Sequence, residues 1–163
     1  MRFDEERQGR FDILIGQAAL AGQERRFSEA FEHLQKAEAM LAEHGITDAY
    51  DWSGYLDLRM SIQENSKDHQ AAATTARQML DAIDPMPEGF SPRQQEIIQD
   101  SLVEAALLRA RHLLTLPTQE AAAELGPLID SAVHWCERLG RDGDEREFRE
   151  MRESLAAHES GTA

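Results

Sequence analysis

The sequence contains little cysteine, few aromatic residues and no long apolar run, and each shortage excludes a class of protein. Cys136 is the single cysteine among 163 residues, so no intramolecular disulfide can form and nothing indicates an oxidising compartment. Residues 1–7 are charged and lack the apolar core of a signal peptide. No stretch approaches the roughly 20 apolar residues that span a bilayer. We therefore expect a soluble, cytoplasmic protein with no membrane segment.

Positive charge is also scarce. Only Lys36 and Lys67 are lysines among the 17 basic residues, and the net charge is −14. Such a charge repels phosphates over most of a surface, so we expect neither nucleic acid nor an anionic membrane as a partner. The same charge suits a basic partner, or is simply a solvated acidic exterior.

Motifs that carry chemistry are missing as well. The sequence contains no glycine-rich phosphate loop and no nucleophile elbow. None of the six histidines has another histidine three or four residues away, which excludes the helical zinc motif. Cys136 lies on an apolar stripe with Ala132 and Leu139, a pattern that predicts a buried structural thiol. We therefore expect no enzyme, with no catalytic residue, metal or cofactor.

Helical periodicity runs through almost the whole chain. Aromatic residues make up only 6% while alanine and leucine are plentiful, which favours closely packed helices over a sheet. Apolar residues recur at three- and four-residue steps in seven segments. The expected helices cover approximately residues 4–23, 28–44, 48–64, 68–83, 91–113, 118–139 and 144–158.

Capping residues and breakers mark the ends of these helices. We expect Gly45 to end the second helix in the left-handed conformation, and Gly140 to end the sixth helix. Residues 84–90 contain two prolines and a glycine and cannot be helical. Gly126–Pro127 should kink or divide the sixth helix. The predicted N-caps are Ser28, Thr47 or Asp48, Ser66 or Asp68, Ser91 before Pro92, and Thr118.

The first two helical pairs share a pattern of small and apolar residues. The first pair carries Leu14 and Ala18, then Ala30, Leu34 and Ala37, and a fainter copy carries Leu56, Ala72, Ala76 and Met79 at an offset of 42 residues. This pattern resembles the tetratricopeptide repeat, clearest over residues 11–45. The resemblance implies stacked antiparallel helix pairs that bind other proteins.

The fold class that we expect is therefore all-α, with three antiparallel helix pairs and a C-terminal capping helix in a tetratricopeptide-like α-solenoid. A compact helical bundle is the alternative. Residues 1–159 should form a single domain and residues 160–163 a disordered tail.

The function that we expect is that of a non-enzymatic protein-interaction module, an adaptor, scaffold or chaperone-like protein that binds another protein or a peptide. An acidic inhibitor or immunity-type protein that masks a basic surface is one alternative, and an accessory subunit of a larger complex is another. Its oligomeric state is left open. Three rings within six residues cannot all face one core, and arginines could line a groove for an acidic peptide. The candidate partner-binding residues are Tyr50, Trp52, Tyr55, Arg77, Arg109 and Arg111.

Overall fold

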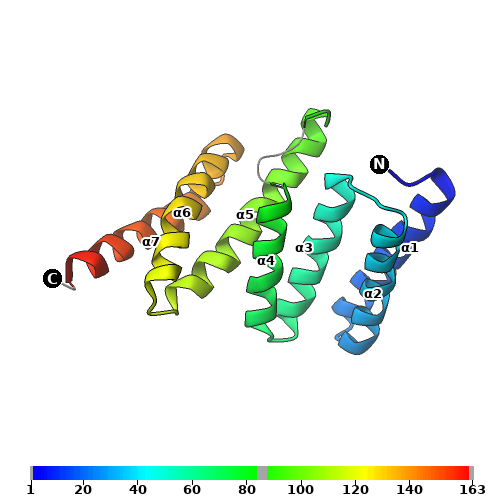
Figure 1. Cartoon of the computed structure of the whole chain (residues 1–163), viewed down its shortest axis with the longest axis horizontal. Coiled ribbons are helices and arrows are strands. Elements are labelled where there is room, and N and C mark those ends of the chain that lie inside the picture. Colours follow the sequence, from blue (N-terminus) through cyan, green and yellow to red (C-terminus); the bar gives the residue numbers. More distant parts are fainter. Residues whose placement is uncertain (1, 84–87, 162–163) are drawn as a thin grey trace. The chain divides into compact units, whose positions relative to one another are not determined.

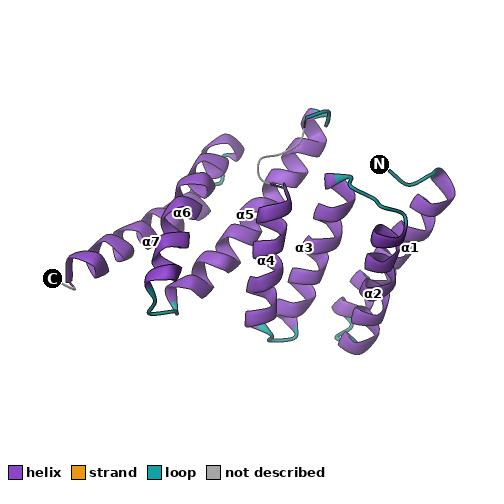
Figure 2. Cartoon of the chain, in the orientation of Figure 1, coloured by secondary structure: helices purple, strands orange, loops and turns teal. Residues whose placement is uncertain are grey.

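Every regular element in the described part of the chain is an α-helix. The structure is a computed structural model, and it describes residues 2–83 and 88–161. Over these residues it contains helices and loops but no strand (Figure 2). The helices are α1 (Glu5–Gln23), α2 (Phe27–Glu43), α3 (Ala49–Asn65), α4 (His69–Ile83), α5 (Pro92–Leu114), α6 (Gln119–Leu139) and α7 (Asp142–Gly161). They pack as the pairs α1–α2, α3–α4 and α5–α6, which confirms the predicted all-α class and its three antiparallel pairs (Figure 1).

The chain divides into two compact units, Met1–Gly89 with α1 to α4 and Phe90–Ala163 with α5 to α7. The single domain expected over residues 1–159 stays a prediction. The tail expected over 160–163 overlaps the last two residues of α7, and residues 162–163 lie outside the described residues. Most of the expected loop at 84–90 also lies outside them, because residues 84–87 are not described.

Local capping chemistry determines most helix ends. Asp48, Ser91 and Thr118 each accept a backbone N–H at the start of their helices, as predicted. Gly45 and Gly140 adopt φ of 59° and 68° after α2 and α6, the left-handed conformation expected of a C-cap glycine. Ser28 is not a cap, so that prediction is wrong. The helix begins one residue earlier, at Phe27.

The reason for the early start of α2 is the turn before it. Arg25 adopts a φ of 61°, in the left-handed region, and reverses the chain within three residues. Lys67, 42 residues later, adopts a φ of 69° between α3 and α4. The ends of α1 and α3 and the starts of α2 and α4 are also 42 residues apart. The first unit is therefore an internal structural repeat of two helical hairpins.

This shared turn allows a matched pair of substitutions. A non-glycine residue in the left-handed region is strained, so Lys67→Gly should raise the free energy of unfolding by about 0.5–1 kcal/mol. Arg25→Gly should raise the free energy of unfolding by less. The Arg25 guanidinium lies 5.3 Å from the centre of the Phe27 ring, and this contact would be lost. Urea unfolding of both variants measures the difference. A loss of stability in Lys67→Gly would contradict the strain argument.

The two hairpins of the first unit are joined by close backbone approach and by polar contacts. A Cβ atom placed on Gly22 of α1 would lie 3.0 Å from Ile62 Cγ1 of α3, so a larger residue there would need the Ile62 side chain to shift by a few tenths of an ångström. The Tyr55 hydroxyl of α3 donates to Glu38 of α2 at 2.8 Å. Within the second hairpin, the Thr75 hydroxyl donates to Gln63 Oε1 at 2.6 Å, which satisfies two buried polar side chains. The register of α2, α3 and α4 is therefore held by specific contacts.

In the second unit, α6 runs from Gln119 to Leu139 with Pro127 inside it. The breaker at Gly126–Pro127 therefore does not divide this helix. Arg141, between α6 and α7, joins α5 to α7, because its guanidinium contacts Asp144 of α7 at 2.7 Å and, on α5, the Asp100 carbonyl oxygen at 3.2 Å and Glu104. Phe148 of α7 is completely buried.

Asp51, in the first turn of α3, is a buried acid of the first unit. Its side chain is part of a residue only 8% exposed, and it accepts a hydrogen bond of 3.1 Å from Gln8 Nε2 of α1. Burial is the main cause that raises the pKa of Asp51 above its ordinary value, and the nearby carboxylates of Asp48 and Asp12 add to it. The ionised form therefore costs stability in the folded state.

Asp51→Asn should consequently stabilise the protein at pH 7. When folding raises the pKa of a carboxyl group, its ionised form destabilises the folded state at pH values above the raised pKa. Below the ordinary value of about 3.9 the group is protonated in both the folded and the unfolded state, and it has no effect on stability. Asparagine keeps an oxygen for Gln8 but carries no charge. Thermal unfolding between pH 7 and pH 3 should show that Asp51→Asn is more stable than the unmodified chain at pH 7, and that this gain in stability disappears as the pH falls. A gain that does not vary with pH would rule out this explanation.

Candidate functional site

The first unit contains a pocket built on the N-terminal half of α3. Asp48 caps α3 by accepting the backbone N–H groups of Tyr50 and Asp51, which fixes the first turn of the helix. Trp52 follows in that turn, and its indole Nε1–H donates to the Ile46 carbonyl oxygen at 2.8 Å. The ring is thus held against the α2–α3 connection.

Tyr55 supports the Trp52 ring from behind. The two ring centroids lie 5.9 Å apart at an interplanar angle of 84°, an edge-to-face contact. Tyr55 is only 2% exposed, and burial together with its hydrogen bond to Glu38 raises the pKa of the phenol. The hydroxyl therefore remains a donor to Glu38 at neutral pH.

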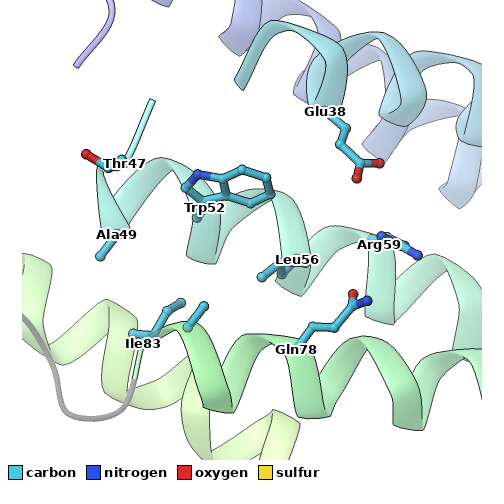
Figure 3. A pocket seen from close by; sticks show the side chains of 9 residues that line it. Glu38, Thr47, Ala49, Trp52, Leu56, Arg59, Gln78 and Ile83 are labelled. Atoms are coloured by element: carbon cyan, nitrogen blue, oxygen red, sulfur yellow. The ribbon is translucent and has the colours of Figure 1, made fainter. Parts of the chain in front are cut away.

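Three helices surround the pocket in front of these rings. Its volume is about 370 Å³. Trp52 and Leu56 of α3 lie between Glu38 of α2 and the α4 side chains of Gln78 and Ile83 (Figure 3). The lining residues, which we call the Trp52 pocket, are Glu38, Thr47, Ala49, Trp52, Leu56, Arg59, Gln78, Ala82 and Ile83.

The Trp52 pocket combines an apolar floor with a polar rim. The indole ring, Leu56 and Ile83 supply the floor, while Glu38 and Gln78 are exposed and can contact a ligand at the edge. Its volume lies within the roughly 300–1,000 Å³ of pockets that bind small ligands or anchor side chains. The arrangement suits recognition of an apolar group that carries a polar or charged neighbour.

The predicted aromatic residues occupy three different environments. Trp52 lines the pocket, Tyr55 belongs to the core behind it, and Tyr50 is 38% exposed without lining the pocket. The ring of Tyr55 is therefore not accessible to a partner, whereas those of Trp52 and Tyr50 are.

The predicted arginines contact carboxylates within their own units. Arg77 of α4 lies 3.7 Å from Asp81. Arg109 of α5 donates two hydrogen bonds to Glu124 of α6, at 2.7 and 3.1 Å. These two arginines therefore already have negatively charged neighbours.

Arg111 of α5 is held in the same way by α7. It donates two hydrogen bonds of 2.8 Å to Glu147, and this contact raises the pKa of Arg111 and lowers that of Glu147. Since Arg109 faces α6 and Arg111 faces α7, the two do not form one anion site. An acidic peptide would have to displace these internal carboxylates.

Sequence reasoning did not find Glu38, Arg59 or Gln78. Each is an ordinary polar residue on a helix surface, and the three come from three different helices. Only the packing of α2 and α4 against α3 brings them to one rim. No local pattern in the sequence could have identified them.

Other candidate chemistry is weak in the described residues. Cys136 is completely buried, and this burial is the main cause that raises the pKa of its thiol to about 11. The prediction of a buried structural thiol is therefore confirmed. Over residues 2–83 and 88–161, no three His, Cys, Asp or Glu side chains are grouped so that they could hold a metal ion. Within the same residues, no helix is sufficiently long and apolar to cross a membrane.

Comparison with protein-family models, with curated proteins and with solved structures finds no match for this chain.

Proposed function

We propose that this chain is a non-enzymatic, cytoplasmic protein-interaction module of tetratricopeptide-like helix pairs that binds a segment of another protein in the Trp52 pocket. The observation that carries the proposal is the apolar floor of this pocket, where the half-buried Trp52 ring lies beside the buried side chains of Leu56 and Ile83. Tryptophan in a preformed pocket is typical of sites where a few residues dominate binding. The internal repeat of two hairpins supports the tetratricopeptide-like architecture.

The charge of the chain and the Glu38 carboxylate favour a bulky apolar side chain next to a lysine or arginine, with Arg59 as the opposing charge on the pocket lining. Glu38 is exposed at the edge, where it can pair with a basic residue. The net charge of −14 would attract a basic segment and repel an acidic one. The arginines Arg77, Arg109 and Arg111 lend no support to an acidic partner, because each already contacts a carboxylate.

Selection from a random peptide library displayed on phage tests the proposal. The bait is the purified chain, and a parallel selection uses Ala82→Trp. Ala82 lines the pocket and is exposed, so a tryptophan there should fill the pocket without disturbing the core. Ala39→Trp is the matched control, because Ala39 is an exposed alanine of α2 that does not line the pocket.

Peptides with an apolar anchor beside a basic residue should be enriched by the unmodified chain and by Ala39→Trp. Their affinity for Ala82→Trp should fall at least about tenfold, the loss expected when one anchor is excluded. Equal binding to both tryptophan variants would refute the pocket as the site. Enrichment of basic peptides without an apolar anchor, with binding that is lost at moderate salt, would favour the acidic inhibitor instead.

A further inference from the structure

The Trp52 pocket has an apolar end and a polar end. Arg59 follows Trp52 by seven residues, so it lies roughly two turns, about 10 Å, further along α3. Because α4 runs antiparallel to α3, Gln78 lies nearer the Arg59 end of the pocket and Ile83 nearer the Trp52 end. In Figure 3 the side chains of Glu38, Arg59 and Gln78 end on one side of the pocket. The Trp52 ring and Ile83 lie on the other side.

Two opposite charges lie close together at the polar end. The Tyr55 hydroxyl donates to Glu38 at 2.8 Å. Burial and this hydrogen bond raise the pKa of the phenol, while the positive charge of Arg59 opposes the rise, so the guanidinium lies near the same hydroxyl. Among the described residues, no carboxylate oxygen lies within 4.0 Å of that guanidinium, in contrast to the ion pairs of Arg109 and Arg111. The two charges therefore do not neutralise each other in an ion pair.

A ligand with a single charge matches only half of this polar end. An amine is attracted by Glu38 and repelled by Arg59, and the reverse holds for a carboxylate. An apolar residue inside a peptide chain offers no charge to Arg59. A free α-amino acid carries an ammonium and a carboxylate on the same carbon atom, so it can pair with both side chains at once.

We propose that the Trp52 pocket binds a free α-amino acid with a large apolar side chain. The ammonium group pairs with Glu38, the carboxylate pairs with Arg59, and the side chain lies against Trp52. The pocket volume of about 370 Å³ is near the lower limit for small-ligand sites, which suits one molecule of this size. The amino acid would occupy the pocket assigned above to a peptide, so it would compete with the peptide for this site.

An NMR titration of the ¹⁵N-labelled chain with L-phenylalanine tests the proposal. The chain has two tryptophans, so two indole N–H signals report on two places in the molecule. Trp135 lies in the second unit and is only 8% exposed, which makes its signal an internal control. The Trp52 signal should shift with a Kd of about 0.1–1 mM, the range for a ligand of about 12 non-hydrogen atoms. The Trp135 signal should not move.

Two analogues of L-phenylalanine each lack one charged group. Phenethylamine lacks the carboxylate, and 3-phenylpropanoate lacks the ammonium group. Each should bind at least about tenfold more weakly than L-phenylalanine, the loss expected when one hydrogen bond to a charged group is removed.

Two substitutions remove the matching charges from the protein. Arg59→Gln should weaken the binding of L-phenylalanine about tenfold, but not that of phenethylamine, which does not use the guanidinium. Glu38→Gln should weaken L-phenylalanine to the same extent, but not 3-phenylpropanoate, and glutamine keeps an oxygen for the Tyr55 hydroxyl. Arg77→Gln is the matched control and should bind like the unmodified chain, because Arg77 is an exposed arginine of α4 that does not line the pocket.

A Trp52 signal that does not move up to about 10 mM L-phenylalanine would overturn the proposal. Analogues that bind as tightly as the amino acid would overturn it as well. If the library peptides bind and L-phenylalanine does not, the amino-acid ligand is excluded and the peptide site stands. If L-phenylalanine binds and the library yields no peptide, the amino-acid site stands and the peptide function fails.

Discussion

Replacement of Phe148 by alanine is expected to lower the free energy of unfolding by about 3–5 kcal/mol, the range for removal of a fully buried aromatic ring. Phe148 is completely buried, and α7 packs onto the rest of the second unit mainly through α6. A loss of this size is a large fraction of the roughly 5–15 kcal/mol that stabilises a folded protein. Helix α7 should therefore detach first.

The other side chains of α7 contribute little to the stability of its attachment. Only Phe148 and Met151 are buried among its described side chains. Arg149 and Arg152 pair with Glu137 and Asp130 of α6, but all four side chains are exposed, and exposed ion pairs contribute at most about 1 kcal/mol. The attachment of α7 consequently depends on one ring more than on its many charges.

Urea unfolding measures the loss, and hydrogen exchange of the α7 amides shows where it acts. Glu147→Gln is the control, because it removes the pairing with Arg111 one residue away from Phe148. It should cost at most about 1 kcal/mol, since the pair is largely exposed. If Phe148→Ala costs no more than this control, or if α7 keeps its protection, the ring does not hold the helix.

The control also has a pH dependence of known sign. The Arg111 guanidinium lowers the pKa of Glu147, so the pair stabilises the folded state above the ordinary pKa of a glutamate. This contribution is lost as the pH falls through the lowered pKa. The difference in free energy of unfolding between the unmodified chain and Glu147→Gln should therefore become smaller at acid pH.

The helices and most of their ends could be predicted because their signals are local. An Asp48, Ser91 or Thr118 side chain needs only its own next three residues to act as a cap. Ser28 failed as a cap because the turn depends on a left-handed Arg25, and arginine gives no sign of that conformation in a sequence.

The sites were less predictable because their contacts join distant residues. Arg109 and Arg111 resembled free cations on a helix surface, yet their carboxylate partners lie 15 and 36 residues away. Trp52 could be singled out as a large ring near two tyrosines. Its pocket could not, because Glu38 and Gln78 reach the rim only after α2 and α4 pack on α3.

Trp52→Ala is expected to have the largest effect on binding. The substitution removes the main apolar wall of the pocket, so affinity for a peptide obtained from the library selection should fall about 100-fold, which is typical of a dominant interface residue. The same change removes the donor to Ile46 and the contact with Tyr55. The free energy of unfolding should therefore also fall, by about 2–3 kcal/mol, less than for a fully buried ring.

Trp52→Phe separates these two effects. Phenylalanine keeps an aromatic wall and the contact with Tyr55, but it cannot donate to the Ile46 carbonyl oxygen, so stability should fall by about 1 kcal/mol. Peptide affinity should fall less than tenfold, because the apolar floor with Leu56 and Ile83 remains. Isothermal titration calorimetry and urea unfolding of both variants give the two quantities independently.

The comparison distinguishes a ring that binds from one that only supports the fold. If Trp52 only supported the fold, Trp52→Ala would lose peptide affinity only to the extent that it unfolds. It would then bind the peptide normally at temperatures where it is fully folded. A folded Trp52→Ala protein that keeps the affinity of the unmodified chain would therefore exclude the pocket as the binding site. A folded protein that has lost binding, beside a Trp52→Phe variant that retains it, would assign the affinity to the indole wall itself.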